Sequence, residues 1–120
     1  MTFYDSELKV MEVLWTHGDL RAKEISDILK AEVDWNINTT YTVIKKCIKK
    51  GAIARQEPHF QCHALITREE AQMAETEELI GKMYDGSVDK LFATLLGHGR
   101  LSNTEIQHLK EMVAELEEES

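Results

Sequence analysis

Hydrophobic residues recur at helical spacing through the first third of the chain. The first predicted helix runs from Asp5 or Ser6, as its cap, to Gly18. Its apolar positions recur at i, i+3, i+6 and i+7, which places them on one helix face: Leu8, Met11, Leu14 and Trp15. A second, short amphipathic helix is predicted from about residue 20 to residue 33.

The segment from residue 37 to residue 51 is predicted to form a third helix with two different faces. At about 100° per residue, one face is expected to be buried and carries Ile37, Thr40, Tyr41, Ile44, Cys47, Ile48 and Gly51. The opposite face is polar and basic and carries Asn38, Thr39, Thr42, Lys45, Lys46, Lys49 and Lys50. Asn36 is the expected N-cap, and Gly51 is expected to close the helix in the left-handed conformation.

Two short strands are predicted to follow this helix directly. Residues 52 to 57 and 60 to 66 flank Pro58 and His59, and apolar side chains alternate in the second of these segments. Three helices followed by a small hairpin are typical of a winged helix-turn-helix. The sequence therefore predicts a mainly α protein whose N-terminal domain, residues 1–66, is a winged helix with a small β wing.

Residues 67–120 are predicted to form a second, three-helix domain. Its apolar stripes have too little sequence around them to make a closed core, so we expect two subunits to bury them against each other as a homodimer. Thr67 and Glu70 form a capping box at the start of its first helix, and Ser102 and Glu105 form another at the start of its last. The predicted dimerisation residues are Val88, Leu91, Phe92, Leu95, Ile106, Leu109, Val113 and Leu116.

The chain has a net charge of −8, which by itself argues against a polyanionic partner. The charge is uneven: residues 1–66 carry nine basic and nine acidic residues, whereas residues 67–120 carry five basic and thirteen acidic ones. The stretch from Asn38 to Gln56 contains four lysines and Arg55 and no acid. The acidic chain thus contains one cationic segment, on the exposed face of the third predicted helix and the start of the wing.

Short polar side chains near a helix N-terminus, followed by cations, are the parts that a DNA recognition helix needs. We therefore interpret the face as a DNA-binding surface, with Thr39 and Thr42 nearest the base edges and Asn38 beside them. The basic residues would contact phosphates: Lys45, Lys46, Lys49, Lys50 and Arg55. A solvated Lys-rich helix and a winged helix that docks an acidic protein partner are the alternatives at this point.

Other functions lack the residues that they require. No phosphate-binding loop, metalloprotease motif or activated nucleophile is present, so an enzyme is not expected. Cys47 falls on the buried face, and His63 should point away from Cys62, so neither a metal nor another cofactor is expected. The apolar runs are too short for membrane insertion, and the expected location is the cytoplasm.

The order of these elements resembles the penicillinase and methicillin-resistance repressors of the BlaI/MecI type. The residues that carry the resemblance are Glu12 to Trp15, the spaced Thr39, Thr42, Lys46 and Lys49-Lys50-Gly51, and Gly86-Ser87 followed by Leu101-Ser102. The resemblance covers nearly the whole chain. It implies a homodimeric repressor that binds double-stranded palindromic operator DNA and controls antibiotic-resistance or related stress genes.

In that family, a membrane sensor protease pathway relieves repression through cleavage at an Asn-Phe bond of the fifth helix. By position, Thr94 and Leu95 stand there in this sequence. Copper-responsive relatives carry Cys-x-Cys motifs at the C-terminus, whereas residues 112–120 contain no cysteine. A protein-interaction adaptor and a metal-responsive relative of the same family stay open as alternatives.

Overall fold

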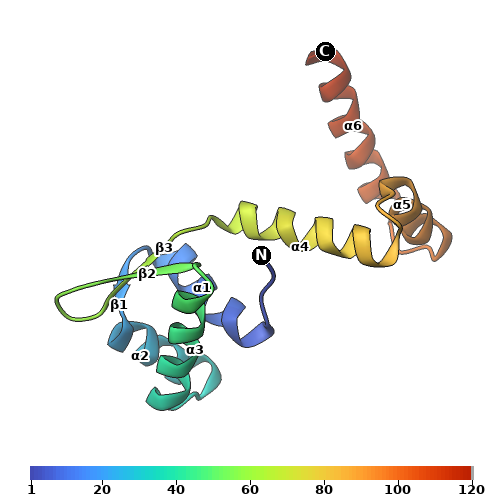
Figure 1. Cartoon of the computed structure of the whole chain (residues 1–120). Coiled ribbons are helices and arrows are strands. Elements are labelled where there is room, and N and C mark those ends of the chain that lie inside the picture. Colours follow the sequence, from blue (N-terminus) through green and yellow to red (C-terminus); the bar gives the residue numbers. More distant parts are fainter. Residues whose placement is uncertain (120) are drawn as a thin grey trace. The chain divides into compact units, whose positions relative to one another are not determined.

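The computed structural model describes residues 1–119, and within them the chain forms six helices and a three-stranded sheet (Figure 1). Ser120, the last residue of the predicted second domain, lies outside the described residues. In chain order the elements are α1 (Asp5–His17), β1 (Leu20–Arg21), α2 (Ala22–Val33), α3 (Ile37–Lys49), β2 (Ile53–Gln56), β3 (Gln61–Ala64), α4 (Arg68–Met83), α5 (Val88–Gly97) and α6 (Asn103–Glu119). The mainly helical class with a small β wing is as the sequence predicts.

The chain divides into two compact units, and the division falls inside α4. The first unit is Met1–Glu78, and the second begins at Leu79. The first turns of α4 belong to the winged helix: the Arg68 guanidinium donates to the Glu12 carboxylate of α1 at 2.7 Å, and Ala71 is buried. The sequence places the domain boundary after residue 66, where the wing ends, and this boundary stays a prediction.

One hydrophobic core fills the first unit. α1, α2 and α3 supply Met11, Ile25, Leu29 and Ile44, and the sheet adds Ile53, all of them almost fully buried. Burial of a side chain of this size contributes about 1.5 to 3 kcal/mol relative to exposure. In α1 the predicted Met11 and Leu14 are buried and Leu8 and Trp15 are half-buried, whereas Val10 and Val13, which the prediction omitted, are buried. Packing of these side chains fixes the position of α3.

The start of α1 differs from the prediction, whereas its end at Gly18 is as predicted. The cap is Tyr4 and not Asp5 or Ser6. The Tyr4 N–H donates to Glu7 Oε1 at 2.8 Å, so a carboxylate inside the first turn satisfies the free backbone donor. At the other end Gly18, with φ of 80°, closes the helix through its N–H to the Leu14 carbonyl at 2.8 Å.

The sheet has one strand more than the sequence predicts. The order is β1-β3-β2, with both pairings antiparallel. β1 pairs with β3 through Leu20 opposite Cys62, and β2 pairs with β3 through Ile53 opposite Ala64. A strand of two residues has no periodicity of its own, because only its pairing with a distant partner defines it.

Within the described residues, the second unit has helices but no closed core in one chain. Ser102 and Glu105 form the predicted capping box at α6, with distances of 2.9 and 3.1 Å between side-chain oxygens and backbone nitrogens. Neither α5 nor α6 contains a buried residue among those described. Within residues 1–119, none of the helices combines the length and apolar character needed to span a bilayer.

Candidate nucleic-acid interface

One side of α3 is buried and the other is exposed, but the buried side is turned slightly from the predicted one. Val43 is buried, although the sequence interpretation omitted it, and Ile37 is 45% exposed, although it was expected to be inside. Thr40, Ile44 and Cys47 are buried as expected. The buried arc is therefore centred between Thr40 and Cys47 and reaches toward Val43, because the first turn of α3 extends beyond the core.

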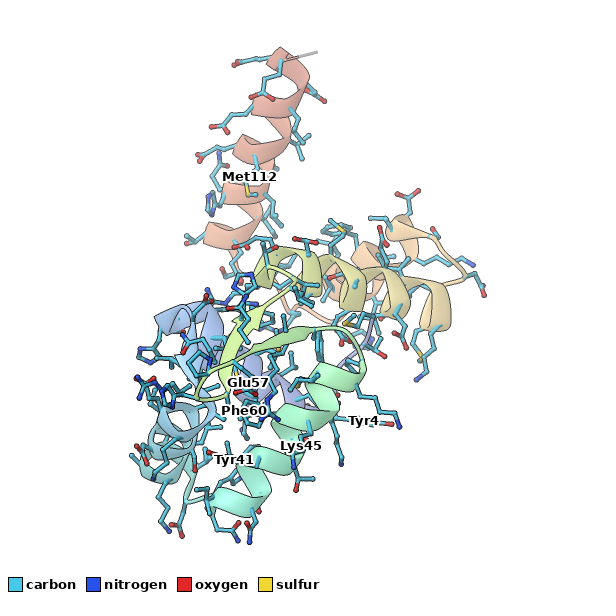
Figure 2. All side chains as sticks on the ribbon, turned by 60° about the vertical axis from the view of Figure 1, so that its left-hand side comes forward. Tyr4, Tyr41, Lys45, Glu57, Phe60 and Met112 are labelled. Atoms are coloured by element: carbon cyan, nitrogen blue, oxygen red, sulfur yellow. The ribbon has the colours of Figure 1, made fainter. Side chains whose placement is uncertain are left out.

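The exposed side of α3 presents six of the predicted residues together. They are Asn38, Thr39, Thr42, Lys45, Lys46 and Lys49. Figure 2 shows Lys45 on this helix, with its side chain directed away from the body of the first unit. None of these three lysines forms an ion pair with any of the described residues, so their charges are available to an anion in solution.

The N-terminal turn of α3 is arranged for contacts with hydrogen-bonding groups of a partner. The Asn36 side chain caps the helix by accepting from the Thr39 N–H at 2.8 Å, as predicted. The Thr42 hydroxyl donates to the Asn38 carbonyl at 2.8 Å, which fixes its rotamer. Thr42 can therefore offer an external partner its oxygen lone pairs and its methyl group, which suit a base amino group and a thymine methyl.

Lys50 does not belong to the exposed face. Its ammonium lies 2.6 Å from Glu7 Oε1 and 2.6 Å from the Thr2 carbonyl, and 4.9 Å from the centre of the Phe3 ring. At about 100° per residue, Lys50 stands only about 20° from Val43 around the helix. Because the buried arc reaches Val43, the lysine emerges at the edge of the core, where Glu7 is 2% exposed. The structure therefore assigns Lys50 to holding the end of α3.

Arg55 lies on β2 at the base of the wing and is already partly engaged. Its Nε–H donates to Glu57 Oε1 at 2.6 Å, and its guanidinium carbon lies 3.7 Å from the centre of the Phe60 ring. Sequence reasoning missed Glu57, although a carboxylate two residues from an arginine in a hairpin is a readable signal. It also counted Tyr41 as core, whereas Tyr41 is only half-buried and contacts the Phe60 ring.

The cysteine and histidine side chains of the first unit are used within the fold. Cys47 and Cys62 are fully buried, and burial raises the pKa of their thiols to about 12 and about 11. His63 points to the exposed side of β3, where Nδ1 lies 2.8 Å from Asp19. Within the described residues, no three His, Cys, Asp or Glu side chains group as a metal ligand set.

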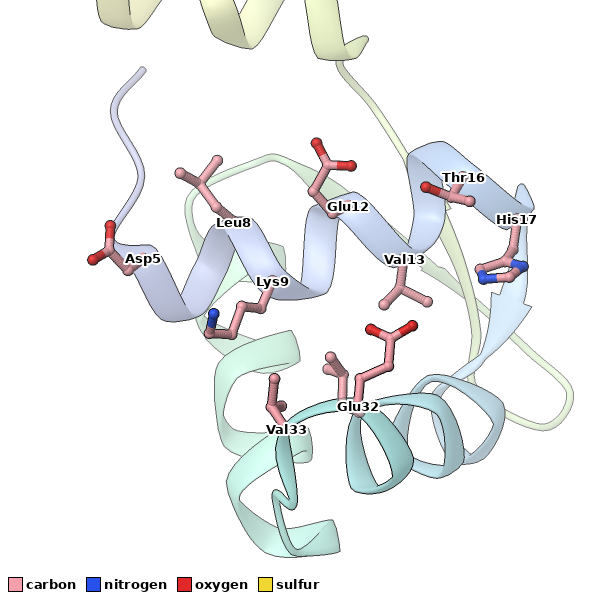
Figure 3. A pocket seen from close by; sticks show the side chains of 10 residues that line it. Asp5, Leu8, Lys9, Glu12, Val13, Thr16, His17, Glu32 and Val33 are labelled. Carbon is pink, nitrogen blue, oxygen red and sulfur yellow. The ribbon is translucent and has the colours of Figure 1, made fainter.

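A groove of about 540 Å³ runs between α1 and the end of α2 (Figure 3). Its charged lining has one lysine, Lys9, and three acids, and its apolar lining includes Leu8 and Val13. The acids are Asp5, Glu12 and Glu32. None of its lining residues comes from α3 or the wing. The groove is thus separate from the exposed face of α3.

The predicted dimerisation residues lie on α5 and α6 and are exposed or half-buried within one chain. Val88, Val113 and Leu116 are 51%, 53% and 66% exposed. The two helices form an apolar groove of about 460 Å³, whose lining includes Phe92, Leu96, Leu101, Ile106, Leu109 and Val113. The second unit therefore presents an apolar surface that its own chain does not cover among the described residues.

Thr94 and Leu95 lie within the regular part of α5. The Thr94 hydroxyl donates to the Lys90 carbonyl at 3.1 Å, and Leu95 is half-buried. Peptide bonds are cut most readily in exposed loop tips. Cleavage between these residues would therefore require α5 to unwind first.

Comparisons with known proteins agree with this arrangement. A family model for the penicillinase repressor matches residues 4–115. The penicillinase repressor of Bacillus licheniformis is 26% identical over 113 residues, which cover 92% of this chain and 88% of that protein. The methicillin resistance regulatory protein MecI of Staphylococcus aureus (strain N315) is 26% identical over 110 residues, which cover 90% and 89%. The solution structure of the DNA-binding domain of the repressor BlaI is similar with a TM-score of 0.53 and 28% identity, covering 58% of this chain and 93% of that one.

Proposed function

The chain belongs to the penicillinase repressor family and is a DNA-binding transcriptional repressor, and we propose that it binds palindromic operator DNA as a homodimer. The observation that carries this proposal is the exposed side of α3. Hydrogen-bonding side chains occupy its first turns, three lysines follow, and no acid lies on the helix. A helix of this kind fits the major groove, which is about 12 Å wide.

The residues of this face have different proposed roles. Thr39 and Thr42, with Asn38 beside them, contact base edges, because they lie in the first turns of the helix. Lys45, Lys46 and Lys49 contact phosphates, and Arg55 contacts a phosphate from the wing. Lys50 is removed from the predicted set, because its ammonium is bound within the protein.

The homodimer proposal is supported by the apolar surface of α5 and α6. Side chains such as Phe92 and Val113 are 41% and 53% exposed in one chain. Exposed apolar patches of this kind on a small protein mark sites of association. A second copy of the chain offers the same surface, so a two-fold arrangement buries both at once. Two α3 helices in one dimer would then read two half-sites of a palindrome.

The controlled genes are proposed to be antibiotic-resistance or related stress genes. The relatives named above are a penicillinase repressor and a methicillin resistance regulatory protein. Transcription of the genes beside this one should rise when it is deleted. An unchanged transcript level of every neighbouring gene would contradict this part of the proposal.

Operator binding can be tested by fluorescence anisotropy with a palindrome from the protein's own promoter. The specific fragment should bind at least about 10³ times more tightly than random DNA at about 0.15 M salt. Lys49→Ala should weaken binding to all sequences and reduce the salt slope by about 1 for each bound subunit. Thr42→Ala should cost about 1 to 3 kcal/mol on the palindrome only.

Lys82→Ala is the matched control, because Lys82 is an exposed lysine of α4 that belongs to the second unit and not to the exposed face of α3. It should change neither the affinity nor the salt slope. Equal affinity for the palindrome and random DNA would refute the operator proposal. Equal effects of Lys49→Ala and Thr42→Ala on every sequence would refute the division of roles.

Dimerisation can be tested by light scattering and by sedimentation. Leu109→Asp places a charge in the apolar groove and should give monomers at micromolar concentration, with much weaker operator binding. Thr104→Asp is the control, since it adds the same charge to the exposed first turn of α6, where an acid is tolerated. A monomeric wild-type protein at this concentration would refute the dimer.

A further inference from the structure

Four residues connect the wing to α3, and we call them the wing cluster: Tyr41, Arg55, Glu57 and Phe60. The Glu57 carboxylate accepts from Arg55 Nε–H at 2.6 Å through one oxygen and from the Phe60 backbone N–H at 3.3 Å through the other. The Arg55 guanidinium also lies on the Phe60 ring, 3.7 Å from its centre. Arg55 is thus fixed in two directions, by a charge in the plane of the guanidinium and by a ring against its flat side.

Phe60 joins this arginine to the helix. Its ring meets the Tyr41 ring edge to face, with 5.7 Å between centres and 72° between planes. Figure 2 shows Glu57 and Phe60 at the wing end that lies against Tyr41. The backbone of Phe60 has a positive φ of 53°, which a bulky residue rarely adopts, and its carbonyl accepts the Ala22 N–H at 3.0 Å. The ring is therefore held by neighbouring elements and is not on a loose loop.

The cluster brings Arg55 next to the exposed face of α3. Tyr41 precedes Thr42 directly and lies one helical turn before Lys45. A group held against Tyr41 is therefore close to a proposed base contact, Thr42, and to a proposed phosphate contact, Lys45. Among the described residues, the Arg55 Nη atoms have no hydrogen-bond partner, whereas Nε is bound to Glu57. The Nη hydrogens can therefore bind a phosphate without disturbing the cluster.

We propose that Tyr41 and Phe60 are positioning residues for DNA binding, which hold Arg55 at a fixed place relative to α3 so that wing and helix contact one half-site as a unit. This inference rests on the proposed operator binding. It assigns a role to Tyr41, which the sequence placed in the core. It also predicts that the contribution of Arg55 depends on an aromatic ring at position 60.

A double-mutant cycle in the full-length protein tests the dependence. Binding of the palindrome is measured by anisotropy between about 0.1 and 0.3 M salt for wild type, Arg55→Ala, Phe60→Leu and the double variant. In the wild-type background, Arg55→Ala should weaken binding about tenfold and reduce the salt slope by about 1 for each subunit. In the Phe60→Leu background, the same change should have less than about a twofold effect and leave the slope unchanged.

Two further variants separate positioning from folding. Phe60→Trp keeps a ring under the guanidinium and should restore the effect of Arg55→Ala. Tyr41→Leu removes the ring that contacts Phe60 from α3 and should reduce the loss of binding caused by Arg55→Ala. Tyr41→Phe keeps the ring and should leave that loss unchanged. If Phe60→Leu does not fold by circular dichroism, the Tyr41→Leu cycle gives the same comparison.

The outcomes distinguish a failure of the positioning role from a failure of the proposed operator binding. Additive effects of Arg55→Ala and Phe60→Leu, with an equal loss of slope in both backgrounds, would overturn the positioning role while operator binding stands. A wild-type protein that does not prefer the palindrome would overturn operator binding, and this is known before any variant is measured. Coupling of both affinity and slope supports the inference.

Discussion

Replacing Lys50 with methionine should destabilise the protein strongly, although Lys50 looks from the sequence like one more surface lysine. Its side chain is 25% exposed, and that of its partner Glu7 is 3% exposed. Burial by itself raises the pKa of Glu7. The hydrogen bonds from Lys50 and from the Tyr4 N–H together lower the pKa by more than burial raises it, so that it lies below the ordinary 4.5. Methionine keeps most of the side-chain volume and removes only the ammonium.

The size of the effect follows from what Glu7 can do without its partner. Burial without the ammonium disfavours the charged carboxylate, so Glu7 takes up a proton in the variant. Protonating a carboxyl with a pKa of 4.5 at pH 7 costs about 1.36 kcal/mol for each of about 2.5 pH units, or about 3.4 kcal/mol. Burial of an unpaired Glu7 therefore cannot cost more than this, because the carboxylate takes up a proton instead. Measured losses for broken buried pairs are similar, and we expect a loss of about 2 to 3 kcal/mol.

Urea unfolding at a fixed protein concentration measures this loss, and pH supplies an internal check. Because the native pKa of Glu7 is lowered, its stabilisation is present above the unfolded value and is lost as pH falls through the native one. In Lys50→Met, the cost of protonating Glu7 falls as the pH approaches 4.5, so the difference between wild type and variant should shrink from pH 7 toward pH 4.5. It should shrink further as the pH falls through the lowered native pKa of the wild type. Lys49→Met is the control and should change stability by less than about 0.5 kcal/mol. Equal losses for the two variants, or a difference that does not depend on pH, would refute the reasoning.

Two further predictions concern the interior of the first unit. Thr40 is fully buried, and its hydroxyl oxygen has no hydrogen-bond partner among the described residues, so Thr40→Val should raise the free energy of unfolding by about 1 kcal/mol. Thermal unfolding checks this against Thr39→Val on the exposed face, and a destabilised Thr40→Val would contradict it. Because burial raises the pKa of the Cys47 and Cys62 thiols to about 12 and about 11, a thiol reagent at pH 8 should label neither in the native protein. Rapid labelling before unfolding would contradict this prediction.

Local patterns were sufficient to predict most of the helices. The spacing of Met11 and Leu14 defined the inner face of α1, and the capping boxes at Thr67 and Ser102 located the starts of α4 and α6, because these signals lie within one or two turns of chain. β1 was missed because a two-residue strand exists only through its pairing with β3. The resemblance to the penicillinase and methicillin-resistance repressors is confirmed by the family match over residues 4–115.

In the candidate site too, features set by spacing within α3 could be predicted, whereas features set by contacts with distant residues could not. The exposed positions of Thr42, Lys45 and Lys49 followed from helical periodicity alone. The position of Lys50 did not, because its partner Glu7 is 43 residues away in the chain and the buried arc of α3 is turned from the ideal one. The contact of Tyr41 with Phe60 likewise depends on where the wing folds back, which no spacing within α3 encodes.

The uncovered helices of the second unit have a consequence for the response to repressor dose. Neither α5 nor α6 buries a described residue within one chain. If pairing completes the species that binds DNA, the concentration of that species rises with the square of the subunit concentration while dimers are scarce. Operator occupancy then falls more steeply than synthesis does when the repressor is diluted by growth. The apolar face of two short helices would thus set a threshold for switching the controlled genes.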